Sequence, residues 1–179
     1  MQRVEEGEVP PMKMSEGTLR GICIRPPRPE GARWTPMLSL DEVMAIEGQG
    51  LQGDRYATGE GSYNRDKPGN RQVSIMHMRA FDGQNAYVPA DTGRNLFFGG
   101  DRIEFAWLAS KNHEFDVGDA RFGFSGYCDP CDVPTRYAGR SHDQSFRKMF
   151  WERGGFLCKV IRTGRIWVGC KIIAPDKGR

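Results

Sequence analysis

The sequence predicts a mainly β protein, in which about seven short strands close into a barrel with two helices outside it. Three observations favour this class. The 179 residues include 23 glycines and 11 prolines, about 19% of the chain against an average near 12%, which indicates many turns. Short segments alternate between apolar and polar residues along most of the chain. Only two segments have helical spacing, and closing the sheet removes its exposed edges.

A chain of this length predicts one domain. Its 38% apolar content is typical of a globular protein. No run approaches the roughly 18 apolar residues of a membrane span, and we expect no secretory signal. Residues 1–16 are rich in Glu, Pro and Met, which predicts a flexible tail before a domain at 17–179. The net charge of +3 is typical of a mildly basic soluble protein and does not indicate a nucleic-acid partner.

The first half of the domain predicts two strands, one helix and a long loop. Residues 18–25 (TLRGICIR) predict the first strand, which the following prolines end. Residues 39–46 predict a short helix, because a serine cap is followed three residues later by a glutamate and then by a glycine stop. The glycine-rich residues 48–71 predict a loop that is either functional or disordered. Residues 72–77 alternate as a second strand.

The second half predicts further short strands and one amphipathic helix. The helix covers residues 145–153 (SFRKMFWER) and ends at two glycines. The last two strands, 156–162 and 165–173, are joined by Thr163-Gly164, which predicts a hairpin. Three alternating segments that precede them predict strands at 95–98, 101–109 and 119–125.

The cysteines predict a reducing, cytoplasmic environment. Their odd number and uneven spacing are not typical of a disulfide framework in a chain large enough to bury its own core. Cys23, Cys158 and Cys170 lie in strand segments, which predicts core thiols. The other two, Cys128 and Cys131, form a CDPC loop whose prolines constrain it.

The CDPC loop has four possible interpretations. It can be half of a zinc site, completed by residues such as His113, His142, Cys158 or Cys170. It can be a dithiol redox pair, or a single reactive or metal-ligating thiolate at Cys131 or Cys128. It can also have no chemical role. A reactive thiolate needs nearby positive charge, which Arg136 and Arg140 are close enough in sequence to supply.

Glycines and arginines elsewhere predict a site for a phosphorylated ligand. Glycine lets backbone N–H groups approach an anion, and arginine binds phosphate through two parallel hydrogen bonds. Taken one at a time, such residues are more often solvated turn residues. No P-loop or dinucleotide fingerprint is present, so nucleotide-binding folds are disfavoured. The candidate residues are Gly53, Asp54, Arg55, Arg71, Arg94 and Asn95.

Six short motifs follow one another in an order that resembles the MOSC domain, the family named after the C-terminal domain of molybdenum cofactor sulfurases. The resemblance extends over residues 17–173, nearly the whole chain. The motifs are GLQGDRY at 50–56, RQVSIMH at 71–77, TGRNLFFGG at 92–100, FDVGDARF at 115–122, CDPC at 128–131 and GGFLCKVIRTGRIWVG at 154–169.

The resemblance implies a β-barrel of mixed, mostly antiparallel strands. It also implies that Cys131, preceded by a proline, carries sulfur or ligates molybdenum. The family's pterin-lining residues correspond to Arg94, Asn95 and the Gly53-Asp54-Arg55 segment. One departure is Cys170, which stands where the family usually has an aspartate.

The resemblance therefore predicts a stand-alone MOSC protein that binds the molybdenum cofactor, molybdopterin. Cys131 would act in sulfur transfer or in molybdenum-dependent reduction of N-hydroxylated compounds, and Cys128 is the second candidate for a catalytic thiol. Arg55, Arg71 or Arg94 would hold the pterin phosphate. A separate protein would donate electrons or sulfur, and we expect no pyridoxal phosphate, nucleic-acid or membrane partner. The alternatives are a zinc-binding or structural barrel, and a module that binds a partner protein.

Overall fold

The computed structural model describes residues 14–32, 34–61, 64, 69, 71–100 and 114–175. Strands dominate it, with short helical turns between them. The strands are β1 (Met14–Ile24), β2 (Leu38–Leu40), β3 (Glu42–Ile46), β4 (Gly50–Leu51), β5 (Val73–His77), β6 (Leu96–Gly99), β7 (Glu114–Val117), β8 (Ala120–Tyr127), β9 (Phe156–Arg162), β10 (Gly164–Trp167) and β11 (Lys171–Pro175). The helical elements are η1 (Met78–Phe81), η2 (Pro89–Asp91), α2 (Val133–Tyr137), η3 (His142–Gln144) and α3 (Phe146–Met149).

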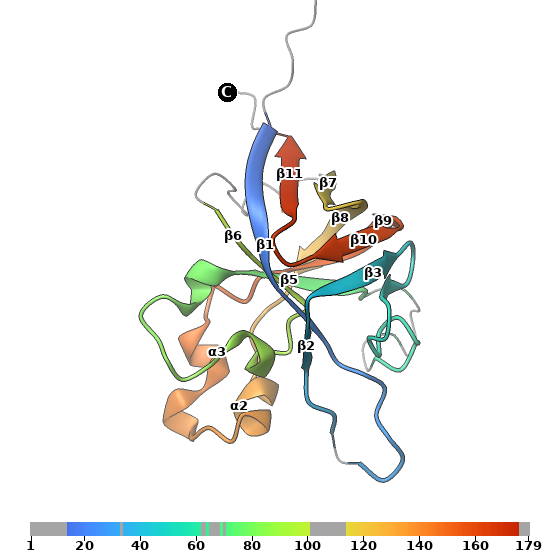
Figure 1. The fold of residues 1–179 in the computed structure, drawn as a ribbon. Coiled ribbons are helices and arrows are strands. Elements are labelled where there is room, and N and C mark those ends of the chain that lie inside the picture. The colour runs from blue at the N-terminus through green and yellow to red at the C-terminus, as the bar shows by residue number, and fades with distance from the viewer. Residues whose placement is uncertain are drawn as a thin grey trace, which may run out of the picture.

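Seven strands close into a barrel in the order β11-β7-β8-β9-β5-β6-β1, and β1 pairs again with β11. Every neighbouring pair is antiparallel except β5 and β6, which are parallel. The long strand β1 pairs in turn with β11, β6 and β2 along its length (Figure 1). The predicted barrel of mixed, mostly antiparallel strands is confirmed.

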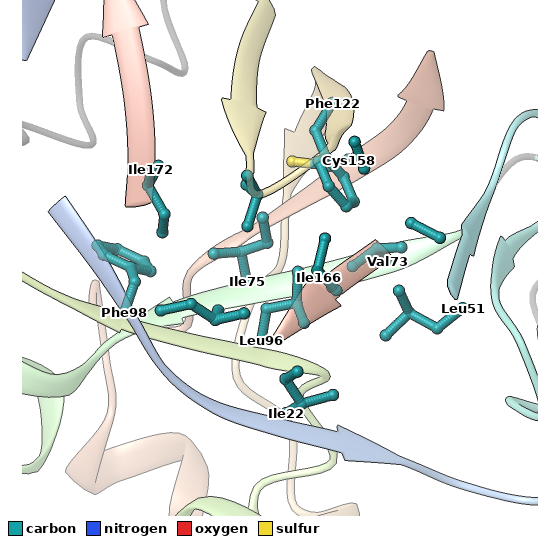
Figure 2. Packing of buried hydrophobic residues seen from close by; sticks show 14 of the residues in the cluster. Ile22, Leu51, Val73, Ile75, Leu96, Phe98, Phe122, Cys158, Ile166 and Ile172 are labelled. Atoms are coloured by element: carbon teal, nitrogen blue, oxygen red, sulfur yellow. The ribbon is translucent and has the colours of Figure 1, made fainter. Parts of the chain in front are cut away.

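The interior of the barrel is filled by the inward-facing residues of its strands. Ile22, Ile75 and Leu96 meet there with residues from β8, β9 and β11 (Figure 2). Leu51 and Ile166 join the same core from a second sheet, in the order β10-β3-β4. This one core accounts for most of the hydrophobic stabilisation of the fold.

A second hydrophobic cluster lies on the outer side of β5 and β6. Met76 and Phe97 point away from the barrel interior and pack with Phe146 and Phe150 of the α3 region. Successive residues of a strand point to opposite faces, so β5 and β6 are buried on both faces only because helical segments cover the outside. Helices α2 and α3 lie together at one end of the molecule, away from the C-terminus (Figure 1).

The prediction of a helix over residues 39–46 is wrong. The segment forms β2 and β3, in which Val43 and Ala45 are buried while Glu42 and Met44 are exposed. That alternation has period two, and backbone pairing with β10 fixes it. The apolar spacing at its start also fits a helical turn, so tertiary pairing decided the outcome.

The predicted C-terminal hairpin is also wrong. Strand β9 pairs with β8 and β5, β10 with β3, and β11 with β1 and β7. Gly164 is the first residue of β10 and pairs with Ala45, and it packs so closely on the Asp119 backbone that a Cβ would overlap it. Thr163 accepts a hydrogen bond from the backbone N–H of Glu47 instead.

Two other segments differ from expectation at their ends. The predicted helix over 145–153 is a single turn, α3, capped by the Ser145 hydroxyl, which accepts from the Lys148 N–H. Residues 14–16 of the predicted tail belong to β1 and pair with β11. Residues 1–13 and the predicted strand at 101–109 lie outside the described residues. None of the described helices is long and apolar enough to cross a membrane.

The close approach of β5 to the start of β9 makes Gly155 a sensitive position. Its φ is +85°, and a Cβ there would overlap the carbonyl oxygen of Ile75. We expect Gly155→Ala to lower the free energy of unfolding by about 3 kcal/mol or more, measured by urea denaturation. Gly139→Ala is the control: its φ is +63° but its surroundings are open, so about 1 kcal/mol is expected. Equal losses would mean that backbone strain alone matters.

Candidate functional site: an arginine-lined pocket beside Cys131

A pocket of about 430 Å³ opens where four stretches of chain meet. They are the segment after β1, the glycine-rich loop, the turn before β6, and the CDPC loop with α2. Its lining residues include Arg25, Trp34, Thr35, Arg55, Tyr56, Arg71, Arg94, Asp129, Cys131 and Tyr137, together with Arg28 and Glu60.

The pocket wall carries more positive than negative charge, with five arginines against two carboxylates. Three of its buried polar atoms have no hydrogen-bond partner among the described residues: Arg25 Nε, Arg55 Nε and Thr35 Oγ1. Burial, followed by repulsion from Arg55, lowers the pKa of Arg25. A buried donor without a partner costs about 1–3 kcal/mol. A bound anion that accepts from these donors would remove that cost.

Asp54 and Asn95 fix the backbone of the pocket from behind. Buried Asp54 accepts hydrogen bonds from the backbone N–H groups of Arg25 at 2.8 Å and of Tyr56 at 2.9 Å. The Asn95 side chain donates to Asp54 at 3.1 Å and accepts from the backbone N–H of Ser74. Burial raises the pKa of Asp54, which these hydrogen bonds oppose. Neither side chain lines the pocket.

Gly53 contributes to the same turn. Its φ of +80° is a left-handed conformation that glycine adopts readily, and it lies two residues before Arg55. The Gly53-Asp54-Arg55 segment thus places one pocket arginine, through backbone geometry and one buried carboxylate. The structure brings together all six residues predicted for the anion site, but only Arg55, Arg71 and Arg94 reach the pocket wall.

Arg94 ties the CDPC loop to the barrel. Arg94 is 3% exposed, so its guanidinium has almost no contact with solvent. Nε donates to the Gly154 carbonyl at 2.8 Å, and one terminal nitrogen donates to the carbonyls of Cys128 at 3.1 Å and Asp129 at 3.4 Å. Burial is the main cause that lowers the pKa of Arg94. Arg94 is therefore engaged with protein carbonyls and sets where the loop, and with it Cys131, lies.

The two cysteines of the loop are in different surroundings. Cys128 is buried, and its sulfur accepts a hydrogen bond from Arg71 at 3.2 Å. Cys131 is partly exposed and lines the pocket. The positive charge near the thiols comes from Arg71 and Arg94, not from the predicted Arg136 and Arg140. Helix α2 leaves Arg136 exposed, and Arg140 lies 3.9 Å from Asp91.

The remaining cysteines are core residues, as predicted. Cys158 and Cys170 lie in the barrel core and Cys23 in the second cluster. Burial raises the pKa of all three thiols, most strongly that of Cys158. Cys170, in the place of the family's usual aspartate, packs near the backbone of Gly118 rather than in the pocket.

The described residues provide no group of three or more His, Cys, Asp or Glu side chains that could hold a metal ion. Of the ligands considered for a zinc site, His142 is exposed and the two core cysteines lie in the barrel interior. His113 lies outside the described residues. His77 accepts a hydrogen bond from the Arg79 backbone N–H and packs edge-on against Phe98.

Sequence reasoning missed the wall that follows β1. This wall contains Arg25, Trp34 and Thr35. From the sequence, the prolines in this segment predicted only that the first strand ends there. Tyr56 and Tyr137 were also missed, although each is close in sequence to a predicted site residue. The arginines on either side of the two prolines at 26–27 were a usable signal. Proline restricts the backbone, so it can hold flanking side chains such as these arginines in a fixed position.

Residues 70–173, more than half of the chain, match the model of the MOSC domain. The chain belongs to the MOSC domain family. This confirms the resemblance drawn from the six motifs. No curated protein shows significant sequence similarity to this MOSC protein.

Solved structures share its fold. YuaD from Bacillus subtilis is 19% identical, with 93% of this chain and 100% of that chain covered and a TM-score of 0.71. YiiM from Geobacillus stearothermophilus is 15% identical, with 93% of this chain and 77% of that chain covered and a TM-score of 0.62. YiiM from Escherichia coli is 16% identical, with 94% of this chain and 72% of that chain covered and a TM-score of 0.57.

The unequal burial of the cysteines predicts one fast-reacting thiol. In the folded protein we expect Ellman's reagent to modify Cys131 rapidly and the four buried thiols slowly. Cys131→Ser should remove the fast phase, and Cys128→Ser should leave it in place. A fast phase that disappears with Cys128→Ser instead would contradict the arrangement of the loop.

The hydrogen bonds of Arg94 predict a coupled loss of stability and loop order. Lysine cannot reproduce the fork that reaches three carbonyls, so Arg94→Lys should lower the free energy of unfolding by about 2–3 kcal/mol. The modification rate of Cys131 should change in the same variant, because its loop is no longer held. Arg136→Lys, on the exposed side of α2, is the matched control and should change neither quantity.

Proposed function

We propose that this MOSC protein binds a molybdopterin-type molybdenum cofactor in the arginine pocket, with Cys131 as molybdenum ligand or sulfur carrier. One observation carries the proposal. The partly exposed thiol of Cys131 lines the same pocket as Arg25 and Arg55, whose buried Nε atoms have no partner among the described residues.

The residues present fit such a group. Guanidinium groups bind phosphate oxygens, and two of them offer N–H donors that the protein leaves unused. A thiolate is a ligand that suits soft transition metals. When bound, the cofactor would supply the redox chemistry. The protein would bind its phosphate at Arg25 and Arg55, present the Cys131 sulfur from a loop held by Arg94, and shield both from bulk water.

Two reaction classes are compatible with this arrangement. In the first, the protein reduces N-hydroxylated compounds with electrons from a separate partner. In the second, the Cys131 thiolate attacks the outer sulfur of a donor persulfide, which forms a persulfide on Cys131 and releases the donor as a thiolate. Both need reduced thiols, and the five free cysteines support a location in the cytoplasm.

The test is the metal and sulfur content of protein purified from a host that makes molybdenum cofactor. We expect molybdenum near one equivalent, or labile sulfane sulfur, in the unaltered protein and neither in Cys131→Ala. Arg25→Gln should lower the retained amount at least tenfold, because about 1.4 kcal/mol of phosphate binding corresponds to a factor of ten. Cys170→Ala, in the core, is the control for thiol loss outside the pocket.

Three outcomes would count against the proposal. Zinc at one equivalent without molybdenum would favour the structural CDPC interpretation. Loading that survives Cys131→Ala but is lost with Cys128→Ala would show that Cys128, and not Cys131, carries the chemistry. Loading that is unchanged in Arg25→Gln would move the anion to another part of the pocket wall.

A further inference from the structure

We propose that the arginine pocket makes Cys131 a site of reversible modification by small disulfides that carry carboxylates, the class to which glutathione disulfide belongs. The product is a mixed disulfide between Cys131 and one half of the small molecule. The proposal goes beyond the proposed function, because it concerns the thiol of the unloaded protein and requires neither molybdenum nor a bound cofactor.

Cys131 differs from the other four cysteines in its accessibility. Cys23, Cys128, Cys158 and Cys170 are buried, whereas Cys131 is partly exposed and lines the pocket. Thiol–disulfide exchange requires that the attacking sulfur reach the disulfide, so a small disulfide that enters the pocket meets this thiol first. Accessible thiols close to positive charge are the ones that undergo reversible modification.

The charge of the pocket wall selects among small disulfides. The wall contains five arginines and two carboxylates. Arg94 donates to loop carbonyls and Arg71 to the Cys128 sulfur, but their positive charge still acts on a molecule inside the pocket. A concave wall with an excess of one sign of charge raises the local concentration of molecules of the opposite sign. Anionic disulfides should therefore reach Cys131 faster than cationic ones.

Arg25 supplies a donor for the carboxylate. It is only 8% exposed and lines the pocket, and its buried Nε has no hydrogen-bond partner among the described residues. The Nε of Arg55, which lines the same pocket, is also without a partner there. A guanidinium binds a carboxylate through two parallel hydrogen bonds. A carboxylate bound in this way would remove the cost of the unsatisfied donors and hold the disulfide beside Cys131.

The exchange step needs no further reagent. The Cys131 thiolate attacks one sulfur of the disulfide, so that a new S–S bond forms and the old one breaks. The released half leaves as a thiolate with the electron pair of the broken bond and takes a proton from water. Cys131 is thereby oxidised and the released half is reduced. A pocket of about 430 Å³ is in the size range of small-molecule sites, and free thiol in excess reverses the reaction.

The test compares three disulfides whose arms have the same length and differ in the end group. Dithiodipropionate is anionic, bis(2-hydroxyethyl) disulfide is neutral and cystamine is cationic. Each reacts with protein from a host that does not make molybdenum cofactor, and intact mass spectrometry follows the mixed disulfide. Each rate is divided by the rate of the same disulfide with thioglycerol, a neutral thiol, which corrects for differences in intrinsic reactivity.

We expect the corrected rate to be at least about tenfold higher for the anionic disulfide than for the cationic one, with the neutral disulfide between them. Added salt should reduce this preference, because it screens the arginines. Glutathione disulfide should modify the same residue, and Cys131→Ser should abolish the reaction with all four disulfides. Arg25→Gln should lower the preference at least about threefold while leaving the rate with the neutral disulfide unchanged.

Two further variants keep the test decisive. Arg28→Glu reverses a charge at an exposed position of the pocket wall, so it should lower the preference even if Arg25→Gln disturbs the fold. Arg136→Gln is the matched control, because Arg136 is exposed on α2 outside the pocket wall, and it should change nothing.

Equal corrected rates for the three disulfides would overturn the proposal, and so would a preference that survives both Arg25→Gln and Arg28→Glu. Neither result depends on molybdenum or sulfur loading, so failure of this proposal and failure of the proposed function are distinguishable.

Discussion

The buried guanidinium of Arg94 is the interaction on which the site depends. It is anchored in the turn before β6 and reaches carbonyls from the CDPC loop and from the segment before β9. Three parts of the chain that are distant in sequence thereby meet around one cation. A charged group this deeply buried is stable only when its donors are satisfied. Cys131 is therefore positioned by the protein itself, before any ligand arrives.

Other arginines in the pocket are treated in the opposite way. The Arg25 backbone N–H donates to Asp54 and the Arg55 backbone N–H donates to the Arg25 carbonyl, while Nε of each side chain is left without a partner among the described residues. The contrast separates arginines that hold the structure together from arginines that are available to a ligand. Among the described residues, the buried side-chain polar atoms without a hydrogen-bond partner all belong to residues that line the pocket, and such atoms are a feature of functional sites.

The sequence was informative where the pattern was local. Alternation identified the segments of β1, β5, β6, β8 and β9, and burial at Cys23 and Cys158 followed from strand position. Cys170 is buried as well, but it lies between β10 and β11 rather than in the predicted strand over 165–173. It failed at residues 39–46 and at the C-terminal pair of strands, because pairing with distant strands decided those segments. Within the site, motifs indicated the thiol loop and three of the arginines. The stacking of Trp34 on Tyr137 arises only when α2 folds back on the segment after β1, and no local pattern encodes that contact.

The pairing of β1 with β11 has a consequence for synthesis of the protein. Residues 14–18 find their partners only at residues 171–175, so the barrel stays open at this seam while nearly all of the domain leaves the ribosome. Until then β1 presents an unpaired edge that can pair with other chains. Because contacts so distant in sequence also slow folding, this seam is where chaperones and competing nascent chains have the longest opportunity to act.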